Sequence, residues 1–243
     1  MVGQAPRASQ RRLLVVSAGC AVNCRYCFRR HFPYQDNSLS TAEWDAALDY
    51  IRQDDSISEV IYSGGDPLAA NDRRLAWLTR EIAAIPHVRR LRIHTRLPIV
   101  IPQRITPELI DALCGTRLPV TMVWHCNHAA ELDELTRDAA NRLRQAGVTL
   151  LNQAVLLRGV NDTLSAQIAL SEALGDSGVL PYYLHLLDRV RGASHFLVPD
   201  YQAQELVGRL LTRLPGYLVP RLVRETAGEP AKVPVSVTLV HDL

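Results

Sequence analysis

Three of the five cysteines lie within eight positions near the start of the sequence. Cys20, Cys24 and Cys27 form the pattern C-x3-C-x2-C in the stretch GCAVNCRYCFRR. Thiolates with this spacing bind zinc or an iron–sulfur cluster. A structural zinc ion needs four ligands, and only His31 or the distant Cys126 is available as the fourth. Three thiolates on one loop therefore favour a [4Fe–4S] cluster that leaves one iron open to another ligand.

A pair of glycines follows the next apolar run, in the stretch YSGGDPL. Gly64 and Gly65 let the backbone approach a ligand closely, because they carry no side chain. Gly-Gly-Asp-Pro is also an ordinary turn sequence. The position of the pair directly after a predicted strand favours a binding role.

The rest of the sequence alternates short apolar runs with longer amphipathic segments. Strands are predicted at residues 12–18, 59–65, 88–96, 119–126, 148–157, 179–188, 221–225 and 233–240. Helices are predicted at residues 40–53, 71–85, 106–114, 131–147, 163–178 and 200–214, with Ser40 or Thr41 as the first N-cap and Gly147 closing the fourth helix. This alternation predicts βαβ units and a parallel sheet.

About six βα units fit this pattern, which predicts an α/β fold: a partial, open TIM-like barrel with a C-terminal β-like tail. We assign residues 1–225 to the barrel and 226–243 to the tail. In such a barrel the chemistry collects on the loops that follow the carboxyl ends of the strands. The cysteine loop, the glycine pair, the stretch HCNH with His125 and His128, and Asp188 all lie at the carboxyl ends of predicted strands or directly after them. A capping or core role is equally compatible with the two histidines.

Composition excludes several classes of protein. The net charge of +2 is not gathered into a dense basic run, so the sequence gives no case for nucleic acid. No apolar run reaches the roughly 18 residues of a membrane helix, and no signal peptide is recognisable. An odd number of cysteines with three close together is not a secreted disulfide framework, which favours the reducing cytoplasm.

Several blocks of sequence carry a resemblance to a known family. The cysteine motif with Tyr26 before its last cysteine is the signature of the radical S-adenosylmethionine (SAM) enzymes, and from Arg11 onward the chain resembles the lysine 2,3-aminomutase family. The matching blocks are CAVNCRYCFRRHFPY, SGGDPL, IPQRIT, NQAVLLRGVND, PYYLHLLD and GEPAKVP. The stretch RETAGEPAK is most similar to the short branch of the family, which serves the (R)-β-lysylation of elongation factor P. Ala8 stands where the family has a tyrosine, so the resemblance weakens before Arg11.

The resemblance implies three cofactors: a [4Fe–4S] cluster, SAM and pyridoxal phosphate. Lys232 is the one lysine of the sequence and matches the lysine that bonds to pyridoxal phosphate in the family, a task that requires an amine. The other implied roles are the cluster for Cys20, Cys24 and Cys27; SAM for Ser63, Gly64, Gly65, Asp66 and His125; pyridoxal phosphate for Arg11 and Gln153; the substrate carboxylate for Arg29; and the distal ammonium of the substrate for Asp188 and Glu225.

By this resemblance the chain is expected to be an isomerase that converts L-α-lysine to β-lysine for attachment to elongation factor P by a separate ligase. An electron donor such as flavodoxin or ferredoxin would reduce the cluster. Two alternatives stay open: a radical SAM enzyme that acts on another substrate without pyridoxal phosphate, and a truncated, non-catalytic iron–sulfur or zinc-binding partner protein. The sequence also leaves ornithine as substrate, and formation of a homo-oligomer, open.

Overall fold

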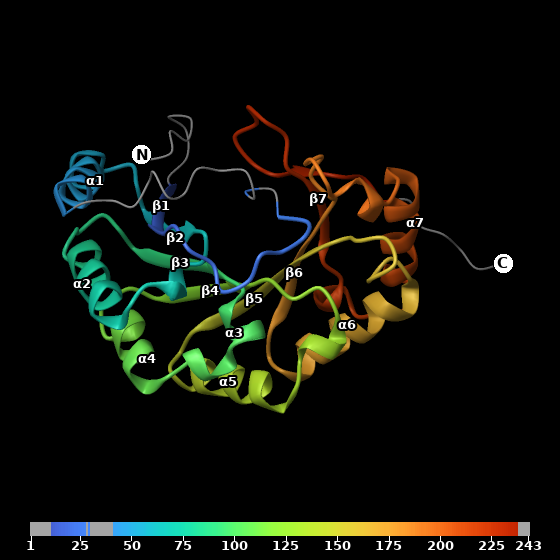
Figure 1. The fold of residues 1–243 in the computed structure, drawn as a ribbon, viewed down its shortest axis with the longest axis horizontal. Helices are drawn as coiled ribbons and strands as arrows, with labels where there is room; N and C mark the ends of the chain where they lie inside the picture. The colour runs from blue at the N-terminus through green and yellow to red at the C-terminus, as the bar shows by residue number, and fades with distance from the viewer. Residues whose placement is uncertain (1–10, 28, 30–40, 238–243) are drawn as a thin grey trace.

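The computed structural model describes residues 11–27, 29 and 41–237. Their strands form one sheet in which spatial order follows chain order from β1 to β8 (Figure 1). The strands are β1 (Arg11–Ser17), β2 (Glu59–Gly64), β3 (Arg90–Thr95), β4 (Val120–Trp124), β5 (Thr149–Val155), β6 (Leu180–His185), β7 (Arg221–Arg224) and β8 (Val233–Pro234). The pairs from β1 to β7 are parallel, and β8 is antiparallel to β7.

Helices lie around the outside of this curved sheet (Figure 1). They are α1 (Thr41–Gln53), α2 (Asp72–Ala83), α3 (Leu97–Val100), α4 (Pro107–Cys114), α5 (Glu134–Gln145), α6 (Leu164–Asp176) and α7 (Asp200–Leu211). At least one helix connects each parallel strand to the next, which makes six βα units before β7. The predicted α/β fold with an open parallel sheet is confirmed.

One helix begins later than its sequence pattern suggested. The amphipathic run starts at Glu131, but α5 starts at Glu134 because the Asp133 side chain accepts a hydrogen bond from the Thr136 amide. Residues 129–131 form a separate 3-10 turn, which a capping box between His128 and Glu131 closes. His128 is therefore a capping residue. Ser40, His31, Ala8 and residues 238–240 of the last predicted strand lie outside the described residues.

The two faces of the sheet differ in what they contact. On β1, Leu14 and Val16 are buried on the helix side. On β2 the Tyr62 hydroxyl lies 3.1 Å from Thr79 Oγ1 of α2, so Tyr62 also points outward. Since alternate residues of a strand share a face, Ser63 points to the opposite, inner face.

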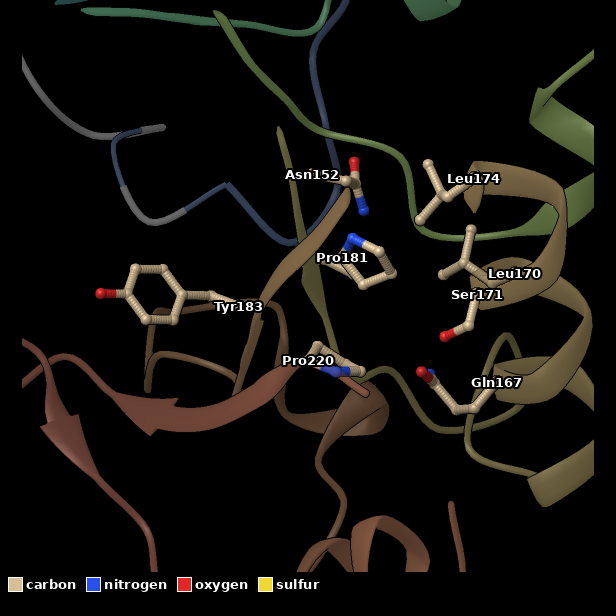
Figure 2. A pocket seen from close by; sticks show the side chains of 9 residues that line it. Asn152, Gln167, Leu170, Ser171, Leu174, Pro181, Tyr183 and Pro220 are labelled. Atoms are coloured by element: carbon tan, nitrogen blue, oxygen red, sulfur yellow. The ribbon is translucent and has the colours of Figure 1, made fainter. Parts of the chain in front are cut away.

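A small, mostly apolar cavity lies between α6 and strands β5 and β6 on the outer side of the sheet (Figure 2). Asn152, Gln167 and Ser171 contribute its polar lining, and all three side chains are buried. The ring of Tyr183 points away from this cavity in Figure 2. The cavity is thus separate from the inner face of the sheet.

The C-terminal tail continues the sheet. Val223 pairs with Pro234 and Arg224 with Val233, so β8 lies along the edge of β7. This pairing brings Lys232, which directly precedes β8, back to the carboxyl end of β7. The division at residue 225 into barrel and tail stays a prediction.

The IPQRIT block fixes a turn by hydrogen bonds. Arg104 donates from Nε to the Leu68 carbonyl at 2.8 Å, and from Nη2 to the Ala70 carbonyl at 3.0 Å. Arg104 Nη2 also lies 2.5 Å from the Asp72 carboxylate at the start of α2. One guanidinium therefore joins the turn after β2 to the first residue of α2.

We expect Arg104→Met to destabilise the protein by about 2 kcal/mol, because three acceptors lose their donor. For a chain of this size that corresponds to a fall in melting temperature of about 4–8 °C, measurable by calorimetry. Arg74→Met is the matched control, since Arg74 is an exposed residue of α2. Equal melting temperatures for the two variants would contradict the assigned role of Arg104.

Candidate active site

The cysteine motif forms the loop after β1. Cys20 is exposed, Cys24 and Cys27 are partly buried, and all three are free thiols. Burial is the main cause that raises the pKa of Cys20 to about 11, and it also raises the pKa of Cys24. Without a metal these two thiols therefore stay protonated at neutral pH.

Tyr26, inside the motif, attaches the loop to the sheet. Its hydroxyl oxygen accepts hydrogen bonds from Arg96 Nη1 and from Asn127 Nδ2, each at 2.5 Å. The ring packs with Leu157 and Phe196 in a small apolar cluster. Both the polar and the apolar part of the side chain are thus held by residues that come much later in the chain.

Arg96 connects three loops at the carboxyl edge of the sheet. It forms a 2.6 Å ion pair with Glu131 and donates to the carbonyl of His125 at 2.9 Å. Glu131 in turn accepts from the amides of Asn127 and His128. The loops after β1, β3 and β4 therefore form one hydrogen-bonded unit.

The glycine pair packs against the cysteine loop. The Gly65 amide donates to the Ser17 carbonyl and the Asp66 amide to the Gly19 carbonyl, both at 2.8 Å. A Cβ on Gly64 would lie 2.3 Å from the Ser17 oxygen, and one on Gly65 would lie 2.3 Å from the Gly19 oxygen. Gly64 also has a φ of 127°. Contact between two loops of the chain itself is therefore enough to require both glycines.

Asp66 is buried beneath this contact, and both of its carboxylate oxygens are used within the protein. Oδ1 accepts from Thr95 Oγ1 at 2.7 Å and from the Leu68 amide at 3.0 Å. Oδ2 accepts from the amides of Arg96 at 2.7 Å and Leu97 at 3.1 Å. Burial raises the pKa of Asp66 although these four bonds favour the ionised form. The carboxylate joins the loop after β2 to the end of β3.

Arg29 lies against residues expected near SAM. Its Nη1 donates to Ser63 Oγ at 2.8 Å and to the Gly64 carbonyl at 2.7 Å. The structure thus brings Arg29 together with the glycine loop and the cysteine loop. Its expected contact with a substrate carboxylate stays a prediction.

Polar side chains line the inner face of β3 to β6. Gln153 Nε2 lies 2.8 Å from His125 Nε2 and 3.4 Å from His94 Nδ1. His185 packs edge-on against Tyr183, with ring centroids 5.7 Å apart. Among the described residues, four buried atoms of this face have no hydrogen-bond partner: Arg92 Nε, His94 Nε2, Gln153 Oε1 and His185 Nε2.

The three histidines of this face are neutral. Burial lowers the pKa of His125 and of His185 to about 3, and lowers that of His94 well below its ordinary value. Nearby positive charges add to the effect, including that of Lys232 on each of them. A neutral imidazole can donate from one nitrogen and accept at the other, which suits a polar ligand.

Lys232 lies with both expected carboxylates at the end of the sheet. Its Nζ forms a 2.7 Å ion pair with Glu225 and lies 5.8 Å from the centre of the Tyr183 ring. Burial raises the pKa of Asp188, the charge of Glu225 raises it further, and Lys232 opposes both. The structure therefore brings Lys232, Glu225 and Asp188 close enough to interact.

Arg11 is separated from the cysteine loop by the length of β1. It begins that strand and pairs in register with Glu59, whose side chain forms a 2.8 Å ion pair with Arg92. Arg11 shares a face with Leu13, opposite to the buried Leu14 and Val16, and so belongs to the inner face at the amino end of the strands. It is the one expected site residue that lies at this end.

The sequence is similar to a family model and to several enzymes. A family model described as the radical SAM superfamily matches residues 14–123. The L-lysine 2,3-aminomutase of Escherichia coli (strain K12) is 54% identical over 94% of this chain and 67% of the relative. That of Haemophilus influenzae is 55% identical over 91% of this chain and 66% of the relative. The enzyme of Clostridium subterminale is 39% identical, over 96% of this chain and 56% of the relative.

The chain belongs to the L-lysine 2,3-aminomutase family. It is thus related to isomerases of the radical SAM superfamily, and the expected family is confirmed. It spans about two thirds of the length of the first two relatives and just over half that of the third. The higher identity to the first two agrees with the resemblance to the short branch.

Solved structures support the fold. The structure titled native anSMEcpe with bound AdoMet and Kp18Cys peptide has a TM-score of 0.60, with 12% identity over 83% of this chain and 58% of the other. HydG, a maturase of the [FeFe]-hydrogenase, has a TM-score of 0.58, with 18% identity over 90% of this chain and 52% of the other. At these identities the likeness concerns the fold alone.

The residues present fit the cofactors of this family. Radical SAM membership implies a [4Fe–4S] cluster and SAM. Three thiols on one loop are the donor set of a cluster with an open iron. Among the described residues, no group of three His, Cys, Asp or Glu side chains is placed to hold a single metal ion, and the three thiols are included in that statement. The fit to a cluster therefore rests on the chemistry and the spacing of the thiols. The unpartnered buried atoms of the inner face fit a polar ligand above it.

Seven residues of this site were assigned no role from the sequence: Arg92, His94, Tyr183 and His185 on the inner face, and Arg96, Asn127 and Glu131 beneath the cysteine loop.

None of the described helices is both long and apolar enough to cross a membrane.

The buried histidines predict how stability depends on pH. A histidine whose folded pKa lies below its ordinary value of 6.5 takes up its proton mainly in the unfolded chain, so stability falls as the pH drops below about 6.5. We expect His185→Gln to make this fall shallower by about 0.7 kcal/mol per pH unit at pH 6.5 and by about 1.3 kcal/mol per pH unit at pH 5. Urea unfolding of both proteins across that range measures the two slopes, and identical slopes would contradict a neutral His185.

Proposed function

We propose that this chain carries the catalytic barrel of a lysine 2,3-aminomutase, which moves the amino group of L-lysine from C2 to C3. The observation that carries the proposal is the position of Lys232. It lies beside Glu225 and Asp188, at the carboxyl edge that also holds the cysteine loop. One amine and two carboxylates at this edge suit a substrate with an ammonium group at its far end.

Each cofactor has residues to hold it. Cys20, Cys24 and Cys27 would hold the cluster, and the loop Ser63–Gly65 with His125 would lie against SAM. When bound, the cluster and SAM supply radical chemistry, and pyridoxal phosphate supplies a covalent attachment for the migrating amino group.

The inner face would bind pyridoxal phosphate. Lys232 is the amine that can bond to it, and Gln153 and His185 each present a buried polar atom without a partner among the described residues. Arg92 Nε is also buried and unpartnered, and Arg11 shares its face. Two guanidinium groups at the amino end of the sheet would suit a phosphate group.

The carboxylates would select the substrate by charge. Glu225 neutralises Lys232 in this structure, so bonding of Lys232 to pyridoxal phosphate would release Glu225 for the ammonium of lysine. Asp188 adds a second carboxylate. Glutamate as substrate would meet repulsion from both, whereas ornithine keeps the favourable charge. Arg29 would bind the substrate carboxylate through a bidentate pair.

The likeness to the short branch of the family also suggests what the product is used for. β-Lysine made here would serve the modification of elongation factor P by a separate ligase, in a cytoplasm that keeps the thiols reduced. A radical SAM enzyme that uses no pyridoxal phosphate is the second candidate, because the cluster loop does not depend on Lys232.

Replacement of Lys232 separates these candidates. Anaerobically reconstituted protein with SAM, pyridoxal phosphate, dithionite and labelled L-lysine should form β-lysine, detected by mass spectrometry. Lys232→Ala and Lys232→Arg should both fall to background, because neither can bond to pyridoxal phosphate, although arginine keeps the charge beside Glu225. Both should also lose the near-visible absorbance of bound pyridoxal phosphate. β-Lysine from Lys232→Arg at the wild-type rate would refute the role of this amine.

A further inference from the structure

Two other loops cover one side of the cysteine loop. The guanidinium of Arg25, between Cys24 and Cys27, lies 5.2 Å from the centre of the Phe196 ring. Arg25 Nη2 lies 3.1 Å from His195 Nε2. The Arg158 amide donates to the Phe196 carbonyl at 2.9 Å. The loop from β6 to α7 therefore touches both the cysteine loop and the loop from β5 to α6.

The surface of these three loops is basic. Its exposed cations are Arg25, Arg158, Arg189 and Arg191. No side-chain hydrogen bond or ion pair joins Arg158, Arg189 or Arg191 to any other described residue. We call these four arginines, with His195, the basic loop surface.

Acidic groups of the same loops offset this charge only in part, because the described residues of the loops hold two carboxylates against the four arginines of the surface. Asp162 accepts a hydrogen bond from the Gly159 amide at 2.9 Å. Asp188 is partly buried and interacts with Glu225 and Lys232. The surface of α5 is different, because its exposed Arg137 alternates there with acidic residues such as Glu134 and Asp138.

Apolar side chains accompany the charges. Val22 of the cysteine loop, Val160 and Leu197 are each 38% exposed. Cys20, in the same loop as Val22, is exposed as well. A basic surface with a few exposed apolar side chains is typical of a small, transient protein interface that is steered by charge.

We propose that the basic loop surface docks an acidic one-electron carrier protein beside the cluster. The proposal rests on the proposed function, because only a redox-active cluster on Cys20, Cys24 and Cys27 needs a donor. One electron passes from the reduced carrier to the cluster, so the carrier is oxidised and the cluster reduced, and no bond forms or breaks in that step. Exposed arginines attract an acidic surface at long range and speed association.

Charge reversal tests the docking surface. Arg158→Glu/Arg191→Glu changes two of its exposed arginines, and Arg137→Glu/Arg142→Glu makes the same charge change on α5. Reconstituted proteins are titrated with an acidic flavodoxin at low salt, which measures binding without any catalytic reaction. Formation of 5′-deoxyadenosine is then compared with reduced flavodoxin and with dithionite as the reductant.

We expect the loop variant to bind flavodoxin about 10- to 100-fold more weakly, and the α5 variant to bind as the wild type does. Added salt should weaken wild-type binding, because it screens exposed charges. With dithionite all three proteins should form 5′-deoxyadenosine equally.

Equal flavodoxin binding by the loop variant and the wild type would overturn the docking site, as would equal losses in the loop and α5 variants. An equal loss with dithionite and with flavodoxin would also overturn it, because the site itself would then be damaged. Failure of the proposed function differs: the wild type would form no 5′-deoxyadenosine with dithionite, while the binding difference between variants would persist.

Discussion

The geometry of the site depends on the hydrogen bonds that the Tyr26 hydroxyl accepts. The cysteine loop contains no helix or strand over residues 18–27, so its own backbone does little to hold it in place. Arg96 and Asn127 reach the hydroxyl from the ends of β3 and β4. A hydrogen bond from a charged donor contributes about 1.5–3 kcal/mol, so the bond from Arg96 is the stronger of the two.

The same carboxyl edge is stabilised by contacts within the protein. Gly64 and Gly65 permit close contact with the backbone of the cysteine loop, and Asp66 accepts four hydrogen bonds from neighbouring groups. Arg104, in the IPQRIT block, holds the turn after β2. Sequence blocks shared with a family thus include residues that build the site through contacts within the protein.

The inner face of the sheet carries different charges at its middle and at its two ends. Histidines that stay neutral line the middle, arginines lie toward the amino end, and Lys232 is balanced by Glu225 at the carboxyl end. Under the proposed function, the positive charges would face phosphate and carboxylate groups, and the carboxylates would face the ammonium of the substrate. Every second residue of a strand points to the inner face, so the order of these side chains along each strand sets the order of charges on that face.

The sequence was sufficient to predict the sheet, its six βα units and the cysteine motif, because periodicity and spacing are local properties. It could not show that Asp66 is used within the protein or that Arg29 contacts Ser63, since these contacts join residues about 30 positions apart. His94 and His185 were missed although a signal existed. His94 lies two residues after Arg92, and His185 lies two residues after Tyr183, which is the spacing of a shared face.

The most direct test is the iron and sulfide content of anaerobically reconstituted protein, with the electron paramagnetic resonance spectrum of its reduced form, for wild type and Tyr26→Phe. The account predicts about four irons per chain and a [4Fe–4S] signal in the wild type. It predicts lower loading in Tyr26→Phe, because Arg96 and Asn127 lose their shared acceptor. A wild type that binds zinc and no iron, or a variant that loads its cluster equally well, would contradict it.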